Sequence, residues 1–215
     1  MVTALAGFAA AATVVILAPG PDSMLVMRNA LRGGRRAGMC TAAGTLTGLF
    51  SWAVAAALGL SSLLAASRTG YDILRLAGAS YLIWLGVSSL LPRRRRGASA
   101  GHSPSEEREA APAPQVGLGR AYLNGVISNL CNPKIGVFFV AFLPGFIPAG
   151  VSVREFSLLL GIWFVLETAL WLTALVSMAV RGMSWLRRPR VERRLERLTG
   201  LVLIGFGIRL ATESR

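Results

Sequence analysis

Histidine and cysteine are scarce in this chain. Its 215 residues include one histidine, His102, which lies in a polar segment, and two cysteines, Cys40 and Cys131, which lie within or at the end of apolar runs. A triad or metal site that needs a histidine inside the apolar runs is thereby excluded. Two cysteines without ligand spacing predict neither a metal site nor a disulfide framework. We therefore expect no metal, no cofactor and packing roles for both cysteines.

Acidic residues are also few. Ten Asp and Glu stand against 23 Lys and Arg, which gives a formal net charge of +13, and Lys134 is the only lysine. A basic balance can indicate nucleic-acid binding. Here, however, the arginines fall in short segments between apolar runs, which is the arrangement of cytoplasmic loops in membrane proteins. We therefore predict no nucleic-acid partner.

Long apolar runs are abundant. Hydrophobic residues make up 53% of the chain, and its mean hydropathy is +0.57. A helix that crosses the hydrocarbon core needs about 20 apolar residues, and six such runs use most of the chain. No Lys or Arg precedes the first run, which we interpret as a retained helix and not a signal peptide. The sequence thus predicts an all-α membrane protein with transmembrane helices at about 2–27, 37–65, 71–91, 121–143, 156–180 and 198–211.

The segment after the third run has a different composition. It opens with four arginines, Arg93 to Arg96, and continues with Ser, Pro, Ala, Gly and Glu. Such a segment cannot bury enough apolar surface to order itself. We predict a flexible cytoplasmic loop over 92–119, whose arginines either anchor the topology or bind anionic lipids. The three loops on this side carry 17 arginines and the opposite side carries five, a bias that places both termini outside.

A short internal repeat links the third and sixth runs. Arg75 and Gly78 recur at the same spacing as Arg197 and Gly200, each pair among aliphatic residues. With three helices in each copy, the second copy enters the membrane upside down, which is a common transporter plan. The predicted organisation is a single membrane domain, residues 1–215, made of two inverted three-helix repeats and the loop between them: 1–91, 92–119 and 120–215.

Proline interrupts the first helix of each predicted repeat. Proline lacks a backbone donor and blocks the preceding turn. Backbone groups freed in this way are tolerated in a membrane only against protein or water. Paired breaks at corresponding positions therefore indicate a substrate site between the halves. The residues of these breaks are Pro19, Gly20 and Pro21 in the first helix and Pro133 in the fourth.

Charged or capping residues accompany both breaks. Asn132 is a favoured N-cap, and a helix that starts inside the membrane presents its positive end to a carboxylate. Lys134 would strengthen that seat; the alternative is a proline kink whose lysine reaches to water. Asp22 either caps the segment that begins at Ser23 or binds a substrate ammonium or a proton.

Glu167 lies near the centre of the fifth run. A carboxylate at that depth costs about 2.5–3.5 kcal/mol on insertion scales, and such residues usually line an ion or substrate path. Burial favours its neutral form, which makes it a proton carrier; the alternative is a protonated glutamate that is hydrogen-bonded for packing. Gly44 and Gly48 form a small-xxx-small pair, which predicts close approach of two helices.

Several segments resemble signatures of the LysE/RhtB family. They are APGPD at 18–22, GRRAG at 34–38, the pair Gly44 and Gly48, NPK at 132–134, the Phe-rich segment 138–144, and Leu166-Glu167 with Trp171. Many members carry a polar or acidic residue where this chain has Leu49, and a Gln where it has Gly145. The first departure shifts any proton or cation role from the second helix to Asp22 and Glu167.

The resemblance implies an exporter of amino acids and related small metabolites across the bacterial cytoplasmic membrane, with proton antiport as the usual proposed driving force. It also implies functional roles for the two motifs, Pro19, Gly20 and Pro21 in one and Asn132, Pro133 and Lys134 in the other. It does not name the amino acid.

From the residues and the resemblance together we predict a transporter that works by alternating access and is no enzyme. Its partners would be an amino acid, protons and membrane lipids, and a homo-oligomer is compatible with its apolar surface. The predicted substrate site is Asp22, Asn132, Lys134 and Glu167, with protons carried on Glu167 and Asp22. Alternatives are a non-transporting scaffold and an exporter or channel for another small solute. An intramembrane enzyme would need a nucleophile–base pair or metal ligands.

Overall fold

The computed structural model describes residues 2–18, 20–90 and 117–182, together with 197, 200, 201, 203–208, 211 and 212. All regular structure in these residues is helical. The elements are α1 (Val2–Leu17), α2 (Pro21–Ala66), α3 (Arg68–Leu90), α4 (Leu118–Leu130), α5 (Pro133–Val137), a π-helical turn η1 (Phe138–Phe142), a 3-10 turn η2 (Leu143–Phe146) and α6 (Val153–Val180). Pro19 and most of the predicted loop, 92–116, lie outside the described residues.

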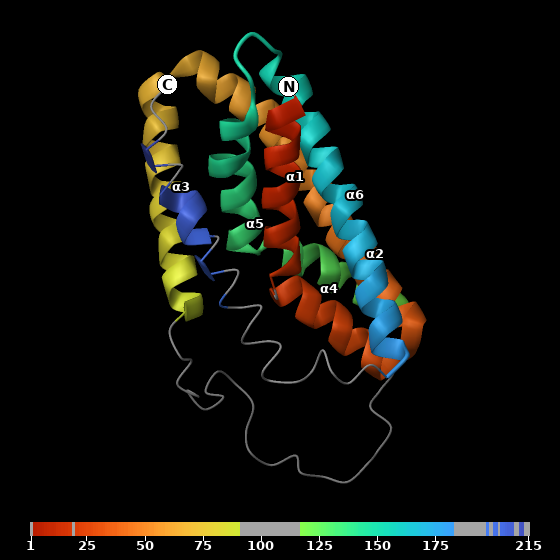
Figure 1. The fold of residues 1–215 in the computed structure, drawn as a ribbon. Helices are drawn as coiled ribbons and strands as arrows, with labels where there is room; N and C mark the ends of the chain where they lie inside the picture. Colours follow the sequence, from red (N-terminus) through yellow and green to blue (C-terminus); the bar gives the residue numbers. More distant parts are fainter. Residues whose placement is uncertain are drawn as a thin grey trace.

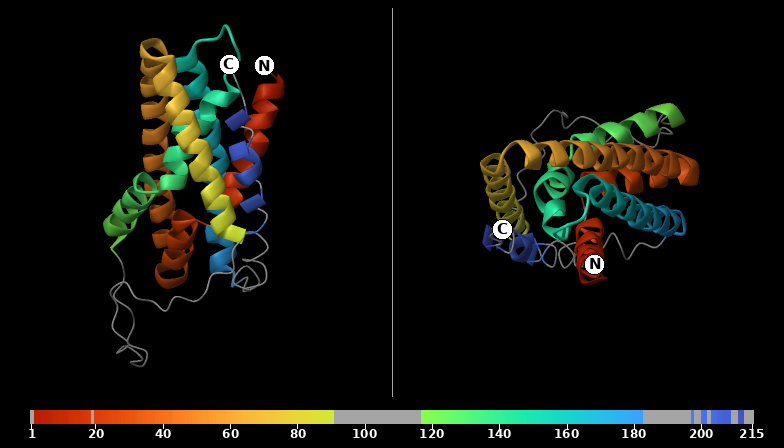
Figure 2. Two further views of the ribbon diagram at one scale, coloured as in Figure 1. Left: turned by 90° about the vertical axis from the view of Figure 1, so that its left-hand side faces the viewer. Right: turned by 90° about the horizontal axis from the view of Figure 1, so that it is seen from above.

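The helices form an elongated bundle. In Figure 1, α1, α3, α5 and α6 run along its long axis, whereas α4 lies obliquely near one end. Figure 2 shows the same oblique course for α4 from a second side. The first residues of α1 and of α6 lie at the same end of the bundle (Figure 1). Residues 203–208, near the end of the chain, are helical and pack on α3, where the backbone of Gly200 approaches Gly86.

Two of the described helices are long and apolar enough to cross a membrane. They are Pro21–Gly59 within α2 and Val153–Val180, which is α6. Leu118–Leu130 and Pro133–Phe146 form a third candidate if this pair, bent by 49°, is one broken span. The fold is thus all-helical and apolar, as predicted, and the fourth predicted helix is interrupted at Asn132. The number of six spans stays a prediction.

The turn between the first two predicted helices corrects the sequence analysis. We expected a loop over about 28–36 because arginine and glycine are concentrated there, but the residues on both sides of Gly34 are helical, and the two helical arms of α2 meet at a kink at Gly34. Gly34 has φ +70° and ψ −171°, a conformation that glycine adopts without a Cβ clash. The two arms then fold against each other: Asn29 Nδ2 donates to Thr41 Oγ1 at 2.8 Å. Polar composition did not distinguish a loop from a kinked helical hairpin.

Small residues let α2 pack along α4. A Cβ on Gly44 would overlap the backbone of Tyr122, and a Cβ on Gly125 would overlap the Thr41 carbonyl oxygen. A Cβ on Gly48 would lie 3.0 Å from that of Asn129. The predicted close approach at Gly44 and Gly48 is confirmed, and its partner is α4. This contact sets Asn129 beside α2 and so prepares the polar site described below.

An aromatic cluster packs between α1, η1, η2, α6 and the helical residues 203–208. Its rings pack edge-on or tilted, with centroids 4.6–5.8 Å apart. The members are Phe8, Phe138, Phe139, Phe142, Phe146, Phe164 and Phe206. Each ring pair adds about 0.5–1.5 kcal/mol beyond area burial. The cluster therefore makes the part of the bundle beyond the two breaks dry and tightly packed.

Candidate functional site

The first break brings Asp22 to the centre of the site. α1 ends at Leu17 and α2 begins at Pro21, so Asp22 lies in the first turn of α2. Asp22 is 8% exposed, and its carboxylate is hydrogen-bonded on several sides. It accepts hydrogen bonds from Ser128 Oγ at 2.7 Å, Asn129 Nδ2 at 3.0 Å and Asn132 Nδ2 at 2.9 Å. These bonds join Asp22 to the end of α4 and to the second break, and do not cap its own helix.

Asn132 links the two breaks. Its side-chain oxygen accepts from the backbone nitrogen of Lys134 at 3.1 Å, with Pro133 in the first turn of α5. This is the N-cap that the sequence predicted. The amide nitrogen of the same side chain donates to Asp22. One buried amide thus starts α5 and fixes the carboxylate at the start of α2.

Lys134 is bonded to the end of α1. Its Nζ donates to the carbonyl oxygens of Val15 at 3.1 Å and Ala18 at 3.3 Å. Carbonyls at a helix C-terminus carry the negative end of the helix dipole, so a cation is favoured there. Gly20 gives the lysine room, because a Cβ at that position would lie 3.3 Å from Nζ. The side chain therefore turns inward to α1, in place of the alternative in which it reaches to water.

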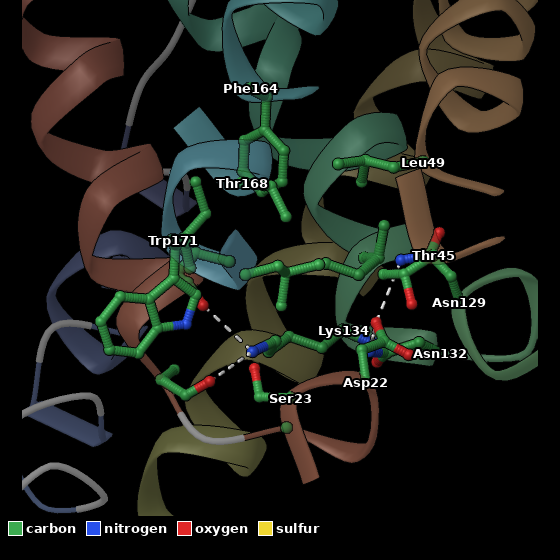
Figure 3. A pocket seen from close by; sticks show the side chains of 16 residues that line it. Asp22, Ser23, Thr45, Leu49, Asn129, Asn132, Lys134, Phe164, Thr168 and Trp171 are labelled. Atoms are coloured by element: carbon green, nitrogen blue, oxygen red, sulfur yellow. Dashed lines mark hydrogen bonds between the residues drawn. The ribbon is translucent and has the colours of Figure 1, made fainter. Parts of the chain in front are cut away.

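A narrow cavity separates these two charged groups. Figure 3 shows Asp22, Asn129 and Thr45 on one side of it, with Trp171 on the other and Thr168 above. Its volume is about 30 Å³, room for roughly one or two water molecules. The lining comes from α1, α2, α4, α5 and α6 and includes Val15, Asp22, Thr45, Leu49, Asn129, Asn132, Lys134, Phe164, Thr168 and Trp171.

Both charged groups retain unused hydrogen-bonding capacity among the described residues. A lysine ammonium has three donors, and Lys134 uses two. A carboxylate has about four acceptor positions, and Asp22 uses three. Each group can therefore bind one further partner of opposite charge without giving up a bond that it already has.

Glu167 does not join the other three predicted site residues. It lies on α6, half-buried, and its Oε1 is in hydrogen-bond contact with Thr13 Oγ1 on α1. Thr13 is exposed and its hydroxyl also contacts the Ala9 carbonyl oxygen at 2.9 Å. Glu167 is absent from the cavity lining. The structure thus brings Asp22, Asn132 and Lys134 together and places Glu167 at the seam between α1 and α6.

Sequence analysis missed several residues of the site. Ser128 and Asn129 bind Asp22, and Thr168 lines the cavity. A signal was present, because Ser128 and Asn129 are polar residues in an apolar run, close before the Asn132-Pro133 break. In the part of the chain that the structure describes, no three His, Cys, Asp or Glu side chains group as metal ligands would.

The chain is similar to known membrane proteins over most of its length. The family model described as LysE type translocator matches residues 13–214. The uncharacterized membrane protein YrhP of Bacillus subtilis (strain 168) is 32% identical over 198 residues, which cover 92% of this chain and 93% of that protein. No solved structure matches the chain.

Two further relatives carry names that state a transported compound. The threonine efflux protein of Escherichia coli (strain K12) is 29% identical over 204 residues and 92% of each chain. The homoserine/homoserine lactone efflux protein of Salmonella typhimurium is 29% identical over 201 residues, 93% of this chain and 92% of that protein.

Proposed function

The chain belongs to the LysE type translocator family, and from this membership we propose that it exports amino acids or related small metabolites across the bacterial cytoplasmic membrane. The names of the threonine and the homoserine/homoserine lactone efflux proteins support this assignment. So does the bacterial origin of these relatives. Their compounds are the first to test on this chain.

One observation carries the proposal: an anionic and a cationic group face one cavity where two helix breaks meet. Asp22 and Lys134 both line it. An amino acid carries an ammonium and a carboxylate on one carbon, so it needs both signs of charge close together. The ammonium would take the free acceptor position of Asp22, and the carboxylate would take the third hydrogen of Lys134. Asn132 would hold the two poles at a fixed spacing.

For the architecture we propose six spans in two inverted three-helix repeats. The breaks support it, because each second helix begins with Pro followed by a charged residue: Pro21-Asp22 in α2 and Pro133-Lys134 in α5. Each charged side chain also bonds to the end of the other repeat's first helix. The arginine bias, 17 against five, supports cytoplasmic loops and both termini outside.

The transport cycle we propose is alternating access. The cavity of about 30 Å³ is too small for an amino acid, so the halves must part to admit one from the cytoplasm. The aromatic cluster beyond the breaks would then have to separate on the opposite side for release. Such rocking of one repeat against the other is usual for inverted-repeat transporters.

Proton antiport is the proposed driving force, with Glu167 as the carrier. The Thr13 hydroxyl has one hydrogen and two acceptors in reach, Ala9 O and Glu167 Oε1. A protonated Glu167 would supply the second hydrogen that this arrangement needs. Thr13 and Val15 both lie near the C-terminal end of α1. Gain or loss of a proton by Glu167 would therefore alter the position of α1 where its carbonyls bond to Lys134. Asp22, already bonded three times, is the weaker candidate.

Efflux from intact cells tests the proposal. Cells with and without the protein are loaded with mixed dipeptides, and every amino acid that appears outside is quantified. A selective rise in one or a few amino acids is the expected result. If no amino acid rises while the protein is verified in the membrane, amino-acid export is wrong, and a scaffold or a carrier of another solute replaces it.

A channel is the second candidate for comparison. Channel flux needs no counter-ion gradient, so its amino-acid release would be unchanged when the proton gradient is collapsed. Export by antiport would instead stop accumulating substrate against its gradient under the same treatment.

A further inference from the structure

The cavity contains hydroxyl groups that the two charged poles do not use. Thr45 on α2 is 2% exposed and Thr168 on α6 is 8% exposed. Both line the cavity, and among the described residues neither hydroxyl oxygen has a hydrogen-bond partner. A buried hydroxyl without a partner is unfavourable by about 1–3 kcal/mol. The molecule therefore holds two buried groups that a bound ligand could satisfy.

Other helix hydroxyls in this chain behave differently. Thr41, Thr47 and Ser177 each donate to the carbonyl oxygen four residues earlier, at 2.8–3.0 Å. That bond is the ordinary way for a Ser or Thr to satisfy itself inside an apolar helix. Ser157 is a further buried hydroxyl without a partner, but it does not line the cavity. Thr45 and Thr168 combine the two properties.

Two more unpaired groups are divided between the poles. Asn129 Oδ1 and Trp171 Nε1 are buried and have no partner among the described residues. In Figure 3, Asn129 lies beside Asp22 and Trp171 lies beside the bonds of Lys134. An acceptor thus accompanies the carboxylate and a donor accompanies the ammonium, as the two ends of a zwitterion require. This leaves the two threonine hydroxyls for the substrate's side chain.

The charged residues of the cavity lining also limit the charge that the substrate's side chain can carry. Asp22 and Lys134 are the charged residues that line the cavity, one of each sign. The α-ammonium and α-carboxylate of a substrate neutralise both. A second cation on the substrate would find no carboxylate there, since Glu167 lies outside the lining, and an unpaired charge in such a site is strongly unfavourable.

We propose that Thr45 and Thr168 form a specificity subsite, which selects an amino acid whose side chain carries an uncharged hydroxyl over aliphatic and cationic amino acids. The subsite rests on the proposed export function and adds to it the class of side chain. A substrate hydroxyl can both donate and accept, so it can satisfy either of these buried threonine hydroxyls. An aliphatic side chain of equal shape offers neither threonine a partner.

Purified protein in proteoliposomes tests the subsite. Uptake of labelled threonine is measured in counterflow against unlabelled threonine, valine or lysine; valine replaces the threonine hydroxyl with a methyl group. We expect threonine to exchange at least about tenfold better than valine, a ratio that one lost neutral hydrogen bond can produce, and lysine not to exchange.

Variants then assign the preference to the two residues. Thr168→Val and Thr45→Val are expected to bring the threonine-to-valine ratio close to one, while Thr168→Ser keeps it. Thr47→Val is the matched control, because Thr47 is exposed and outside the cavity. Ratios in the two cavity variants that equal the wild-type ratio would overturn the assignment.

The wild-type comparison also separates the two proposals and needs no variant. If the protein exchanges valine as well as threonine, the hydroxyl subsite is wrong and amino-acid export stands. If it exchanges lysine best, the charge argument is wrong. If it exchanges no amino acid, both proposals fall together.

Discussion

The two helix breaks are built alike but bonded differently. At the first, Asp22 accepts three hydrogen bonds from the side chains of Ser128, Asn129 and Asn132. At the second, Lys134 donates two to the backbone carbonyls of Val15 and Ala18. The Asp22 carboxylate is thus held by side chains, each of which a single substitution can remove. The ammonium is held by a helix end that no side-chain substitution removes.

From this difference we infer separate roles for the two breaks. Bonds to three side chains, on α4 and at Asn132, fix the position of Asp22, so Asp22 is suited to hold the start of α2 against α4 while α1 moves. Bonds to carbonyls at the end of α1 depend on where that helix stands, so the second break senses its position. We expect substitutions at Lys134 to affect both movement and binding, and those at Asp22 to affect mainly binding.

Removing either charge should have the largest effect. Asp22→Asn and Lys134→Met each leave the other group uncompensated at the same cavity and disturb the hydrogen bonds of the charge that is removed; each hydrogen bond to a charged group contributes about 1.5–3 kcal/mol. Export in cells should fall about 100-fold or more for each variant. The double variant measures coupling: its melting temperature should lie above the value obtained by adding the two single losses. Near-normal export by either single variant would contradict the site.

Glu167→Gln should separate coupling from binding, because Glu167 belongs to neither break. One proton that moves down 100 mV provides about 2.3 kcal/mol, equal to about a 50-fold concentration ratio. The variant should lose this accumulation in proteoliposomes, while exchange of labelled for unlabelled substrate continues. Glu155→Gln, exposed in the first turn of the same helix, is the control. Unchanged dependence on the proton gradient would show that another group carries the proton.

Gly20→Leu changes a residue of the first break but should disturb Lys134, which belongs to the second. A side chain there would extend past a Cβ that already lies 3.3 Å from Lys134 Nζ, and overpacking costs about 1–3 kcal/mol. We expect about a tenfold loss of export with little change in expression. Gly119→Leu is the matched control, since nothing lies within 4 Å of a Cβ at Gly119. Equal losses in both variants would point to a general effect of leucine on helix packing.

Substitutions of Asn132 should have the smallest effect, and two of them separate its cap from its bond to Asp22. Asn132→Ala loses both the cap of α5, about 1 kcal/mol, and the bond to Asp22, whereas Asn132→Ser can keep the cap and loses only that bond. The melting temperature in detergent should therefore fall in the order wild type, Ser, Ala. The step between the two variants should be about 2–4 °C. If Ser and Ala melt together, the capping bond contributes nothing to stability.

Local chemistry made part of this structure predictable. Pro21 and Pro133 predict the two helix breaks because proline cannot continue a helix, and Asn132 predicts the N-cap of α5. Gly44 and Gly48 predict a close helix–helix contact, although only the fold shows that α4 is the partner. These features depend on one segment at a time, which is what a sequence read alone can supply.

The remaining site depends on how helices rotate against each other. Thr45 and Thr168 look like ordinary helix hydroxyls until both turn out to line one cavity. Glu167 looked like a site carboxylate because of its depth, but the rotation of α6 directs it to Thr13. A rotation of one residue, about 100°, decides between cavity and seam, and apolar helices with weak amphipathic patterns do not specify it.

The Gly34 kink has a mechanical consequence. Because the two helical arms of α2 meet at Gly34 without a longer linker, and Asn29 bonds to Thr41 across the kink, we expect the segment that carries Asp22 and the long arm that carries Thr45 to move together. Such joint motion must be taken up around Gly20, where the chain joins α1. The hinge of the molecule and its binding site are then the same few residues, so a ligand that enters the site acts directly on the pivot.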